Sequence, residues 1–435
     1  MALWLLTTLV AWTWAAGGAI QQLLSGDTVL ILRAAGHLAA LLASALLLVQ
    51  IVLMARLPAL ENTIGRDRIV RLHGKVGFSS FTLILAHIAI ATLAYAGADV
   101  DRATTTFWHL TWTYPGMLLA VLGTVAIIVV VLTSPRIVRN RLNYESWHLL
   151  HLYAYLGAGL ALPHQLWTGK DFLRSPILTD LWWAAWALTF AVILLWRLLI
   201  PLVRSIRHDV RVAGVVREGP RTVSVYMTGR RLDELAEPGQ FLVWRFMDRP
   251  GWIRANPFSI SAAPRPDRLR ITVRESGDGT RSLATLEPGT RVLVEGAYGR
   301  LTARARTHPK VAFIGAGAGL APLRSLAEGL AYAPGEAILL ERCGNEPYLP
   351  QELDWLAETR GLRLVRLSGK RRRRTSWVGE GYDGASDSDV IRRWVPDLAE
   401  RDVYVCGPPR WAKSVRRALR KAGLPPDQLH VESFG

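Results

Sequence analysis

The segment "RLHGKVGFSSFTLILAH", residues 71–87, is mostly apolar and has a histidine near each end. With the apolar residues that follow it, the segment is long enough to cross the roughly 30 Å hydrocarbon core of a bilayer as a helix. Ionisable side chains are expensive inside a bilayer and by default indicate function. We therefore expect a membrane helix in which His73 and His87 have a functional role.

Long apolar runs lie almost entirely between residues 1 and 200, although apolar residues make up 50% of the whole chain. Each run is near the ~20 residues that a membrane helix needs. The first run lacks the basic start and the cleavage site of a signal peptide, so we expect it to be retained. The sequence predicts a six-helix membrane bundle, with spans at residues 3–23, 29–54, 70–96, 114–133, 147–167 and 178–200.

Charges in the connections predict the orientation of these spans, because Lys and Arg are retained on the cytoplasmic side. Basic connections alternate with nearly neutral ones. The basic connections carry Arg56, Arg66, Arg68 and Arg71, then Arg136, Arg139 and Arg141, then Arg204 and Arg207. We expect a multi-pass protein of the cell membrane with both termini in the cytoplasm.

A second pair of histidines, His151 and His164, lies in the fifth expected span. The gaps of fourteen residues from His73 to His87 and thirteen from His151 to His164 each correspond to about 20 Å along a helix. Two helices with matched pairs can hold one object at each of two depths.

Haem fits two imidazoles at each depth, because its iron is commonly held by axial histidines. Zinc fits less well, since it prefers four ligands in a tetrahedron. Hydrogen bonding between helices is the alternative role for these side chains. His148 competes with His151 as a ligand, and His37 has no partner at this spacing and is expected to pack or to gate.

Helical angles place the two histidines on a shared helix face in the third expected span, but not in the fifth. Fourteen residues bring His87 within about 40° of the face that carries His73. Thirteen residues leave His164 about 140° away from His151. Because Pro163 removes a backbone hydrogen bond just before His164, we expect a kink or bulge that corrects this offset.

The net charge of +17 comes with no motif that supports nucleic-acid binding, which we therefore exclude. The basic cluster "KRRRR", residues 370–374, is either a solvated loop near anionic lipid or a contact to a nucleotide phosphate. Cys343 and Cys406 fall on the expected cytoplasmic side, where thiols stay reduced, so no disulfide is predicted.

Short β-like runs with turn residues between them predict a small antiparallel barrel over residues 206–306. Within it, "VRESGDGTRSL", residues 273–283, offers an arginine, a glycine turn and then Thr280 at an expected helix start. Backbone NH groups at such a start suit a pyrophosphate, although a surface loop explains the pattern equally well.

Residues 307–435 alternate strand and helix patterns, which predicts a parallel sheet of the Rossmann-like type. The stretch "KVAFIGAGAGLAPLRSLAEGL", residues 310–330, reads as a buried strand, a glycine turn and a helix begun by Pro322. Gly315, Gly317 and Gly319 would let the backbone approach a dinucleotide phosphate at the helix start. A purely structural glycine turn is the alternative.

The ordered set "NPFSIS", "VRESGDGT", "EGAYGR", "GAGAGLAP", "CGPP" and the terminal "ESF" resembles the ferredoxin-NADP reductase family. The preceding spans resemble the ferric reductase and NADPH oxidase superfamily. The resemblance covers nearly the whole chain, which departs from it at Asn256, where His is common, and at Ala321, where Thr is usual. It implies three domains, at residues 1–205, 206–306 and 307–435.

The resemblance implies the following site residues. FAD contacts are expected at Arg254, Asn256, Pro257, Phe258 and Ser259, and around the pyrophosphate at Arg274, Gly279 and Thr280. The nicotinamide nucleotide is expected at Gly315, Gly317, Gly319, Pro322, Gly407 and Pro408, with Cys406 near the hydride path and Phe434 shielding the flavin. His73 and His151 would hold the cytoplasmic-side haem, and His87 and His164 the outer one.

The implied activity is transfer of electrons from cytoplasmic NADPH through FAD and two b-type haems to an acceptor outside. NADPH is preferred over NADH because Arg342 follows the strand "AILLE", where a 2′-phosphate would sit. The acceptor is oxygen, giving superoxide, or a ferric or cupric chelate. Arg33 resembles a basic residue beside the outer haem of such oxidases, or else is an interfacial arginine. A third reading is a haem-free flavoprotein anchored by its spans; the oligomeric state stays open.

Overall fold

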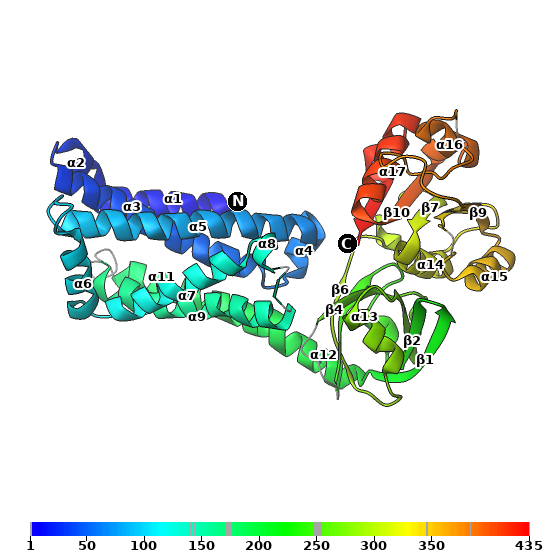
Figure 1. Ribbon diagram of the computed structural model, residues 1–435, viewed down its shortest axis with the longest axis horizontal. Helices are drawn as coiled ribbons and strands as arrows, with labels where there is room; N and C mark the ends of the chain where they lie inside the picture. The colour runs from blue at the N-terminus through cyan, green and yellow to red at the C-terminus, as the bar shows by residue number, and fades with distance from the viewer. Residues whose placement is uncertain are drawn as a thin grey trace. The chain divides into compact units, whose positions relative to one another are not determined.

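A computed structural model describes residues 2–139, 141–142, 144–169, 176–247, 255–344, 347–382 and 384–434. The chain separates into two compact units, Met1–Leu199 and Ile200–Gly435 (Figure 1). The first unit is helical, and the second contains all the strands.

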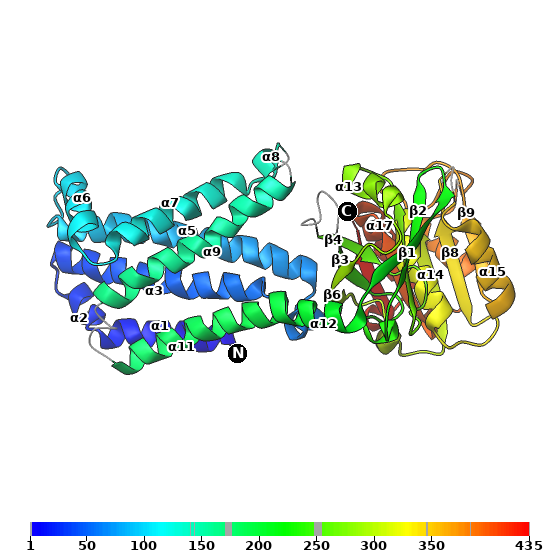
Figure 2. The same cartoon turned by 90° about the horizontal axis from the view of Figure 1, so that it is seen from below.

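Long helices of the first unit run side by side, as two views of the bundle agree (Figures 1 and 2). The helices are α1 (Ala2–Ala16), α2 (Ala19–Leu24), α3 (Thr28–Leu53), α4 (Pro58–Ile64), α5 (Arg66–Tyr95), α6 (Ala103–Thr113), α7 (Met117–Thr133), α8 (Arg136–Arg139), α9 (Tyr144–Thr168), α11 (Pro176–Ile193) and the π-helical turn η1 (Leu194–Leu199). The Asp27 carboxylate caps α3 by accepting hydrogen bonds from the NH groups of Val29 and Leu30.

Length and hydropathy support fewer spans than the six predicted. Among the described residues, three helices can cross a membrane: Thr28–Leu53, Arg68–Tyr95 and Pro176–His208. A fourth span is added if α6 and α7, between which the chain bends by 113°, count as one broken span. The first predicted span is broken after Ala16, and its second part is the short helix α2. In α9, polar residues that include His151 and His164 dilute the apolar sequence.

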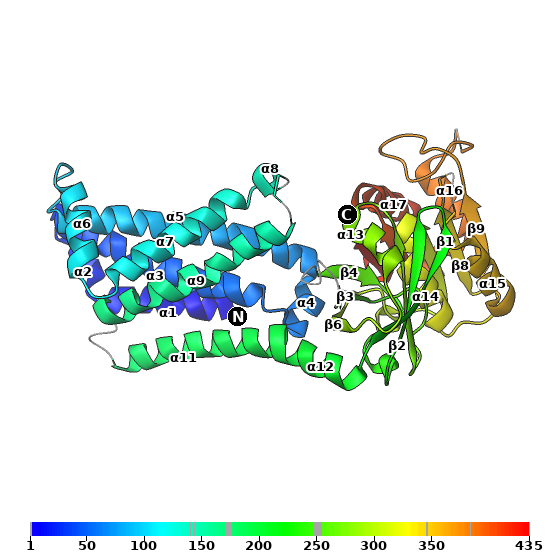
Figure 3. The same ribbon diagram turned by 60° about the horizontal axis from the view of Figure 1, so that its bottom comes forward.

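The second unit begins with α12 (Ile200–His208) and two antiparallel sheets (Figure 3). The strands are β1 (Arg211–Gly219), β2 (Thr222–Thr228), β3 (Phe241–Phe246), β4 (Asn256–Ser259), β5 (Arg268–Arg274) and β6 (Val292–Tyr298). Their orders are β1-β2-β5 and β4-β3-β6, and single bridges, Arg211 to Arg291 and Ile260 to Ile271, join the sheets at both edges. The predicted barrel is thus two linked sheets around one apolar core.

A five-stranded parallel sheet follows, in the order β11-β10-β7-β8-β9. Its strands are β7 (Lys310–Ala316), β8 (Ala337–Arg342), β9 (Arg363–Leu367), β10 (Arg401–Gly407) and β11 (Leu429–Ser433). The chain order reverses between β7 and β10, and in sheets of this kind ligands bind at the carboxyl ends of the strands beside such a reversal.

Helices cover both faces of the parallel sheet. These are α14 (Leu320–Gly329), α15 (Pro350–Arg360), α16 (Asp387–Trp394) and α17 (Pro409–Ala422). Alternate residues of each strand point to opposite faces. Ile314 and Val405 therefore join the core under α16 and α17, whereas Phe313 and Tyr404 join the core under α14 and α15.

Candidate functional site

Polar contacts at a seven-residue spacing tie α5 to its antiparallel neighbour α3. The Nδ1 atoms of His73 and His87 lie 3.0 Å from the Gln50 carbonyl oxygen and 2.9 Å from the Gly36 carbonyl oxygen. Halfway between them, the Ser80 hydroxyl donates to the Ala43 carbonyl at 2.9 Å. Seven residues are two helical turns, so all three contacts lie on one seam.

This seam assigns the tautomers of both histidines. A carbonyl oxygen only accepts, so the Nδ1 atoms of His73 and His87 carry the proton. Each Nε2 then has a free lone pair, which is the form that binds a metal. The helices approach closely at Gly36, where an added Cβ would lie 3.3 Å from Ile90 and 3.4 Å from the Ala91 nitrogen.

The α9 histidines are held differently. The Thr168 hydroxyl donates to the His164 carbonyl at 2.7 Å and lies 2.8 Å from His164 Nδ1. Because a hydroxyl has one proton, it accepts from Nδ1–H, and the Nε2 atom of His164 is also left bare. His151 Nδ1 is buried without a hydrogen-bond partner, while its ring stacks on Trp147 at 5.1 Å.

Histidines of α5 and α9 lie near each other at two levels. The rings of His73 and His151 lie edge-on to each other, with centres 6.1 Å apart and planes at 61°. His164 interacts electrostatically with His87, as His151 does with His73. The helix α9 continues through Pro163, so His151 and His164 lie on one continuous helix where the sequence predicts a kink or bulge.

These residues fit haem. Two imidazoles on opposite sides of one metal ion have ring centres roughly 6 Å apart, because each metal–nitrogen bond is about 2 Å and each ring adds about 1 Å. The observed 6.1 Å matches this spacing. Within the described ranges, no group of three or more His, Cys, Asp or Glu side chains gathers as a metal site. Two histidines at one level are the number of ligands that a six-coordinate haem iron can take from a protein.

Other predicted residues of this unit lie near the pairs. His148 interacts electrostatically with His151, but the ring that faces His73 is that of His151. His37 interacts with His87 in the same way. Arg33 is exposed on α3, one turn before Gly36, whose carbonyl holds His87.

The predicted flavin segment forms β4, the edge strand of its sheet that pairs with β3. Asn256 and Ser259 are buried, Phe258 is half-buried and Pro257 is exposed. The Trp244 indole donates to the Phe258 carbonyl at 2.9 Å, which fixes β4 against β3. Arg254 lies outside the described residues.

The predicted pyrophosphate turn follows β5, which ends at the half-buried Arg274. The helix there is a single turn, α13 (Asp278–Arg281), which contains Gly279. The Thr280 hydroxyl accepts from the NH groups of Ser276 at 2.9 Å and Gly277 at 3.1 Å. Thr280 thus organises the loop that carries these NH groups.

The predicted nucleotide turn lies at the chain reversal of the parallel sheet. Gly315 is buried one residue before the end of β7, Gly317 has a positive φ of 55°, and Pro322 is buried in the first turn of α14. A Cβ on Gly319 would lie 2.3 Å from the Cys406 carbonyl oxygen, so only glycine fits there. The turn after β7 therefore touches the end of β10, where Cys406, Gly407 and Pro408 lie.

The chain end completes this region. The Phe434 NH donates to the Gly407 carbonyl at 3.4 Å, and its ring packs edge-on against Phe241 at 6.3 Å. Phe241 pairs in register with Ser259 of β4. Phe434 therefore joins the predicted flavin and nucleotide segments. Cys406 is fully buried, and burial, assisted by Glu432, raises the pKa of its thiol well above the usual range.

Arg342 does not offer a free guanidinium for a 2′-phosphate. It is buried and donates to the carbonyls of Cys343, Leu367 and Gly369. Two arginines of the cluster 370–374 are likewise engaged within the chain. Arg371 donates to the Ser376 carbonyl, and Arg372 pairs with Asp387 at 3.0 Å. The preference for NADPH gains no support from these side chains.

A buried ion-pair cluster, not predicted from the sequence, lies beside the two segments. Glu352 of α15 accepts two bonds from Arg270 of β5, at 2.5 and 2.6 Å, and pairs with Arg324 of α14 at 2.8 Å. Both arginines donate to the carbonyl of Ser261, just after the flavin segment. The only sequence signal is a charge within apolar runs at each arginine, which does not reveal the partner.

Two stretches of the chain match known families. Residues 39–162 match the ferric reductase like transmembrane component, and residues 313–417 match the oxidoreductase NAD-binding domain. The first stretch contains His73, His87 and His151 and ends two residues before His164. The second contains the glycine turn and the end of β10.

About half of the chain is similar to several reductase components. The stachydrine N-demethylase reductase subunit of Rhizobium meliloti is 30% identical over 216 residues, covering 46% of this chain and 58% of that protein. The ferredoxin reductase component of the 3-ketosteroid-9-alpha-monooxygenase of Mycolicibacterium smegmatis is 28% identical, and the match covers 52% of this chain and 65% of that protein. The chain thus spans less than two thirds of the length of these relatives.

Among solved structures, the FAD/NAD binding domain of a nitric oxide dioxygenase from Vibrio cholerae aligns with 53% of this chain and 99% of its own length, at 19% identity and a TM-score of 0.43. The family matches confirm the resemblance that the ordered motifs predicted. The chain combines a ferric reductase-like transmembrane component with the NAD-binding domain of an oxidoreductase in one polypeptide.

Proposed function

We propose that this protein is a transmembrane oxidoreductase that carries electrons from NAD(P)H, through FAD and two bis-histidine haems, to a small acceptor on the opposite side of the membrane. The observation that carries the proposal is the set of histidine tautomers. Three Nδ1 atoms are tied to oxygen atoms of the chain, which leaves three Nε2 atoms ready to bind metal.

Each part of the chain has a separate task in this proposal. The histidines of α5 and α9 would hold two haems, β4 and the loop after β5 would hold FAD, and the turn after β7 would hold the nucleotide. When bound, the nucleotide supplies a hydride, the flavin separates its two electrons, and the haem irons pass them singly. The protein sets position and excludes water around these groups.

The proposed orientation places the His73 level on the cytoplasmic side and the His87 level outside. Basic residues support it, since Arg56 precedes α5 and Arg66, Arg68 and Arg71 lie in the first turns of α5, at the end where His73 lies. In the same unit, the Arg197 guanidinium lies 3.5 Å from the Met54 carbonyl, at this end of α3. Both termini would then lie in the cytoplasm, and the protein would be a multi-pass protein of the cell membrane.

Oxygen is our first choice of acceptor, giving superoxide, and a ferric or cupric chelate is the second. Arg33 is exposed one turn from the residue that orients His87, where a cation would attract superoxide or an anionic chelate. The two relatives described above are the reductase subunit of an N-demethylase and the ferredoxin reductase component of a monooxygenase, which agrees with the flavin and nucleotide steps.

The test uses the purified full chain, loaded with FAD and haem, and supplies NADPH or NADH in turn. Oxidation of the nucleotide, superoxide formation and ferric-chelate reduction are measured side by side. We expect nucleotide oxidation matched by one of the two products. Nucleotide oxidation without either product, in a protein that carries haem, would contradict the proposal. Equal rates with both nucleotides would remove the predicted preference for NADPH.

A further inference from the structure

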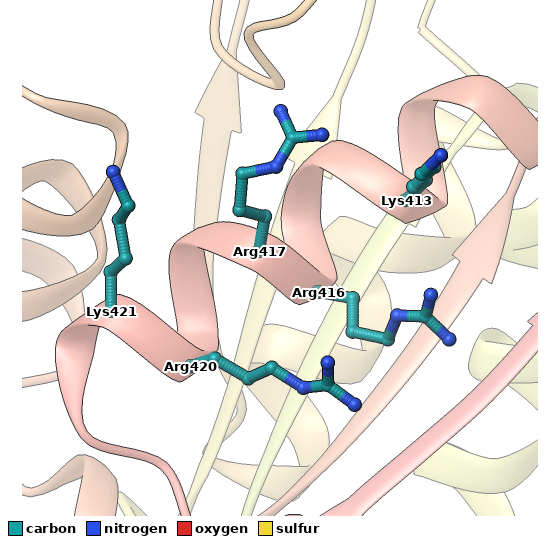
Figure 4. A pocket seen from close by; sticks show the side chains of 5 residues that line it. All are labelled: Lys413, Arg416, Arg417, Arg420 and Lys421. Atoms are coloured by element: carbon teal, nitrogen blue, oxygen red, sulfur yellow. The ribbon is translucent and has the colours of Figure 1, made fainter.

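The outer face of α17 carries a row of cations, Lys413, Arg416, Arg417, Arg420 and Lys421, which we call the basic face (Figure 4). All five side chains are exposed and together line a hollow of about 350 Å³. The opposite side of the helix, with Trp411, Val415 and Leu419, is buried against the parallel sheet. The helix is therefore firmly held with its cations directed outward.

Contacts within the chain do not account for the basic face. Across the described ranges, none of its five side chains forms an ion pair or a hydrogen bond with another residue. Three pairs lie four residues apart on the helix, 413 with 417, 416 with 420, and 417 with 421, and like charges at this spacing destabilise a helix. The helix dipole favours only the cations of the last turn, Arg420 and Lys421.

Cations that repel one another without an internal partner suit an external anionic surface. The basic face has no aromatic or apolar residue that could anchor a protein interface, whose binding energy usually lies in such residues. The chain also carries membrane-spanning helices, so a lipid surface is always close to the unit that contains α17. These features favour lipid headgroups over a protein partner.

We propose that the basic face docks on anionic lipid headgroups of the leaflet that faces the reductase unit. This inference rests on the membrane placement proposed above. Juxtamembrane Lys and Arg gain attraction to anionic lipid within a Debye length of the surface, about 8 Å at physiological salt. Docking would hold the reductase unit in a preferred orientation and would make this orientation depend on lipid charge and salt.

The test places the full chain in nanodiscs of phosphatidylcholine, with or without roughly one third phosphatidylglycerol. Acylation rates of individual lysines are read by mass spectrometry. We expect Lys413 and Lys421 to react several-fold more slowly in the anionic discs, and this protection to vanish near 1 M salt, where the Debye length is about 3 Å. Lys310, which pairs with Asp397 and Glu400, is the internal reference and should not change.

Two charge-reversal variants complete the design. R416E/R417E/R420E should lose the protection of Lys413 and Lys421, whereas R230E/R265E/R268E, with the same charge change at exposed sites elsewhere in the unit, should keep it. Circular dichroism checks that both variants are folded. Equal acylation of Lys413 and Lys421 in both kinds of disc would overturn the proposal. So would equal protection of these lysines when millimolar inorganic phosphate is added to the protein in detergent, without anionic lipid. This readout requires no electron transfer, so a negative result here is distinguishable from a failure of the proposed activity.

Discussion

The His164 imidazole is fixed by one hydroxyl, that of Thr168, at 2.8 Å. Loss of a hydrogen bond that orients a metal-binding histidine commonly lowers metal affinity 10- to 100-fold. We therefore expect Thr168→Val to release one of two haems about tenfold faster to an excess of apomyoglobin, followed by Soret absorbance. Thr168→Ser keeps the hydroxyl and should behave as the unmodified protein. Equal release from both variants would show that Thr168 does not orient His164.

Asp397 gives a pH-dependent contribution to stability. Hydrogen bonds from Arg401, at 2.6 and 2.9 Å, and from Lys310 lower the pKa of this carboxyl to about 2. A depressed folded-state pKa stabilises the protein above the unfolded value, near 4, and this stabilisation is lost as the pH falls towards 2. The group is partly solvated, so its contribution at neutral pH is about 1 kcal/mol.

We expect Asp397→Asn to lower the free energy of unfolding by this amount at pH 7, measured by urea unfolding in detergent. The gap between the variant and the unmodified protein should shrink between about pH 5 and pH 2. Asp427→Asn removes an exposed carboxyl of the same unit and serves as the control. A gap that stays constant over this pH range would contradict the assignment.

At the scale of elements, the start of α7 sets the position of His164. Gly116 has a φ of +76°, and a Cβ there would lie 2.8 Å from the backbone nitrogen of His164. Gly116→Ala should therefore strain the turn, displace His164 and lower the haem content towards one per chain, measured by Soret absorbance. Gly159→Ala is the matched control, because a Cβ at Gly159 meets nothing within 4 Å. Unchanged haem content in Gly116→Ala would contradict this contact.

The cluster of Arg270, Arg324 and Glu352 ties the antiparallel sheets to α14 and α15. Glu352→Gln would leave the buried Arg270 guanidinium without its carboxylate, whereas Arg324 would keep its ion pair with Glu328, and we expect a loss of about 2–4 kcal/mol in the free energy of unfolding. We also expect slower flavin reduction by the nucleotide at unchanged FAD content, because Ser261 follows the flavin segment directly. Glu358→Gln, on the exposed side of α15, should alter neither quantity. A Glu352→Gln protein with normal stability would contradict this role.

At the scale of the whole molecule, sequence patterns predicted the features that depend on local order. The glycine turn after β7 and the histidine spacings are examples, because strand, turn and helix patterns are local. The contacts of Arg342 and the seam from α5 to α3 were missed. They depend on carbonyl groups, which every residue carries and which the sequence therefore does not distinguish. Small residues at Gly36 and Ala43, with Ser80 midway between two histidines, were the available signal.

The six predicted spans show a second limit. Hydropathy is averaged along the chain, so the polar ligands of α9 lower the value for a helix that still lies beside α7 in the bundle. Function and hydropathy are opposed at such a helix, because each ligand that a cofactor needs makes the helix less apolar. In the proposed account, haem would cover these side chains and would let α9 cross the membrane.

The central claim is that two histidine pairs hold two haems, and haem content per chain tests it most directly. The full chain and its single alanine variants are purified with haem supplied, and haem is quantified by Soret absorbance against protein. We predict two haems for the unmodified chain and for His37→Ala, and about one for His87→Ala and for His151→Ala. A chain without a Soret band, or with the same haem content after loss of His87 and of His151, would contradict the account.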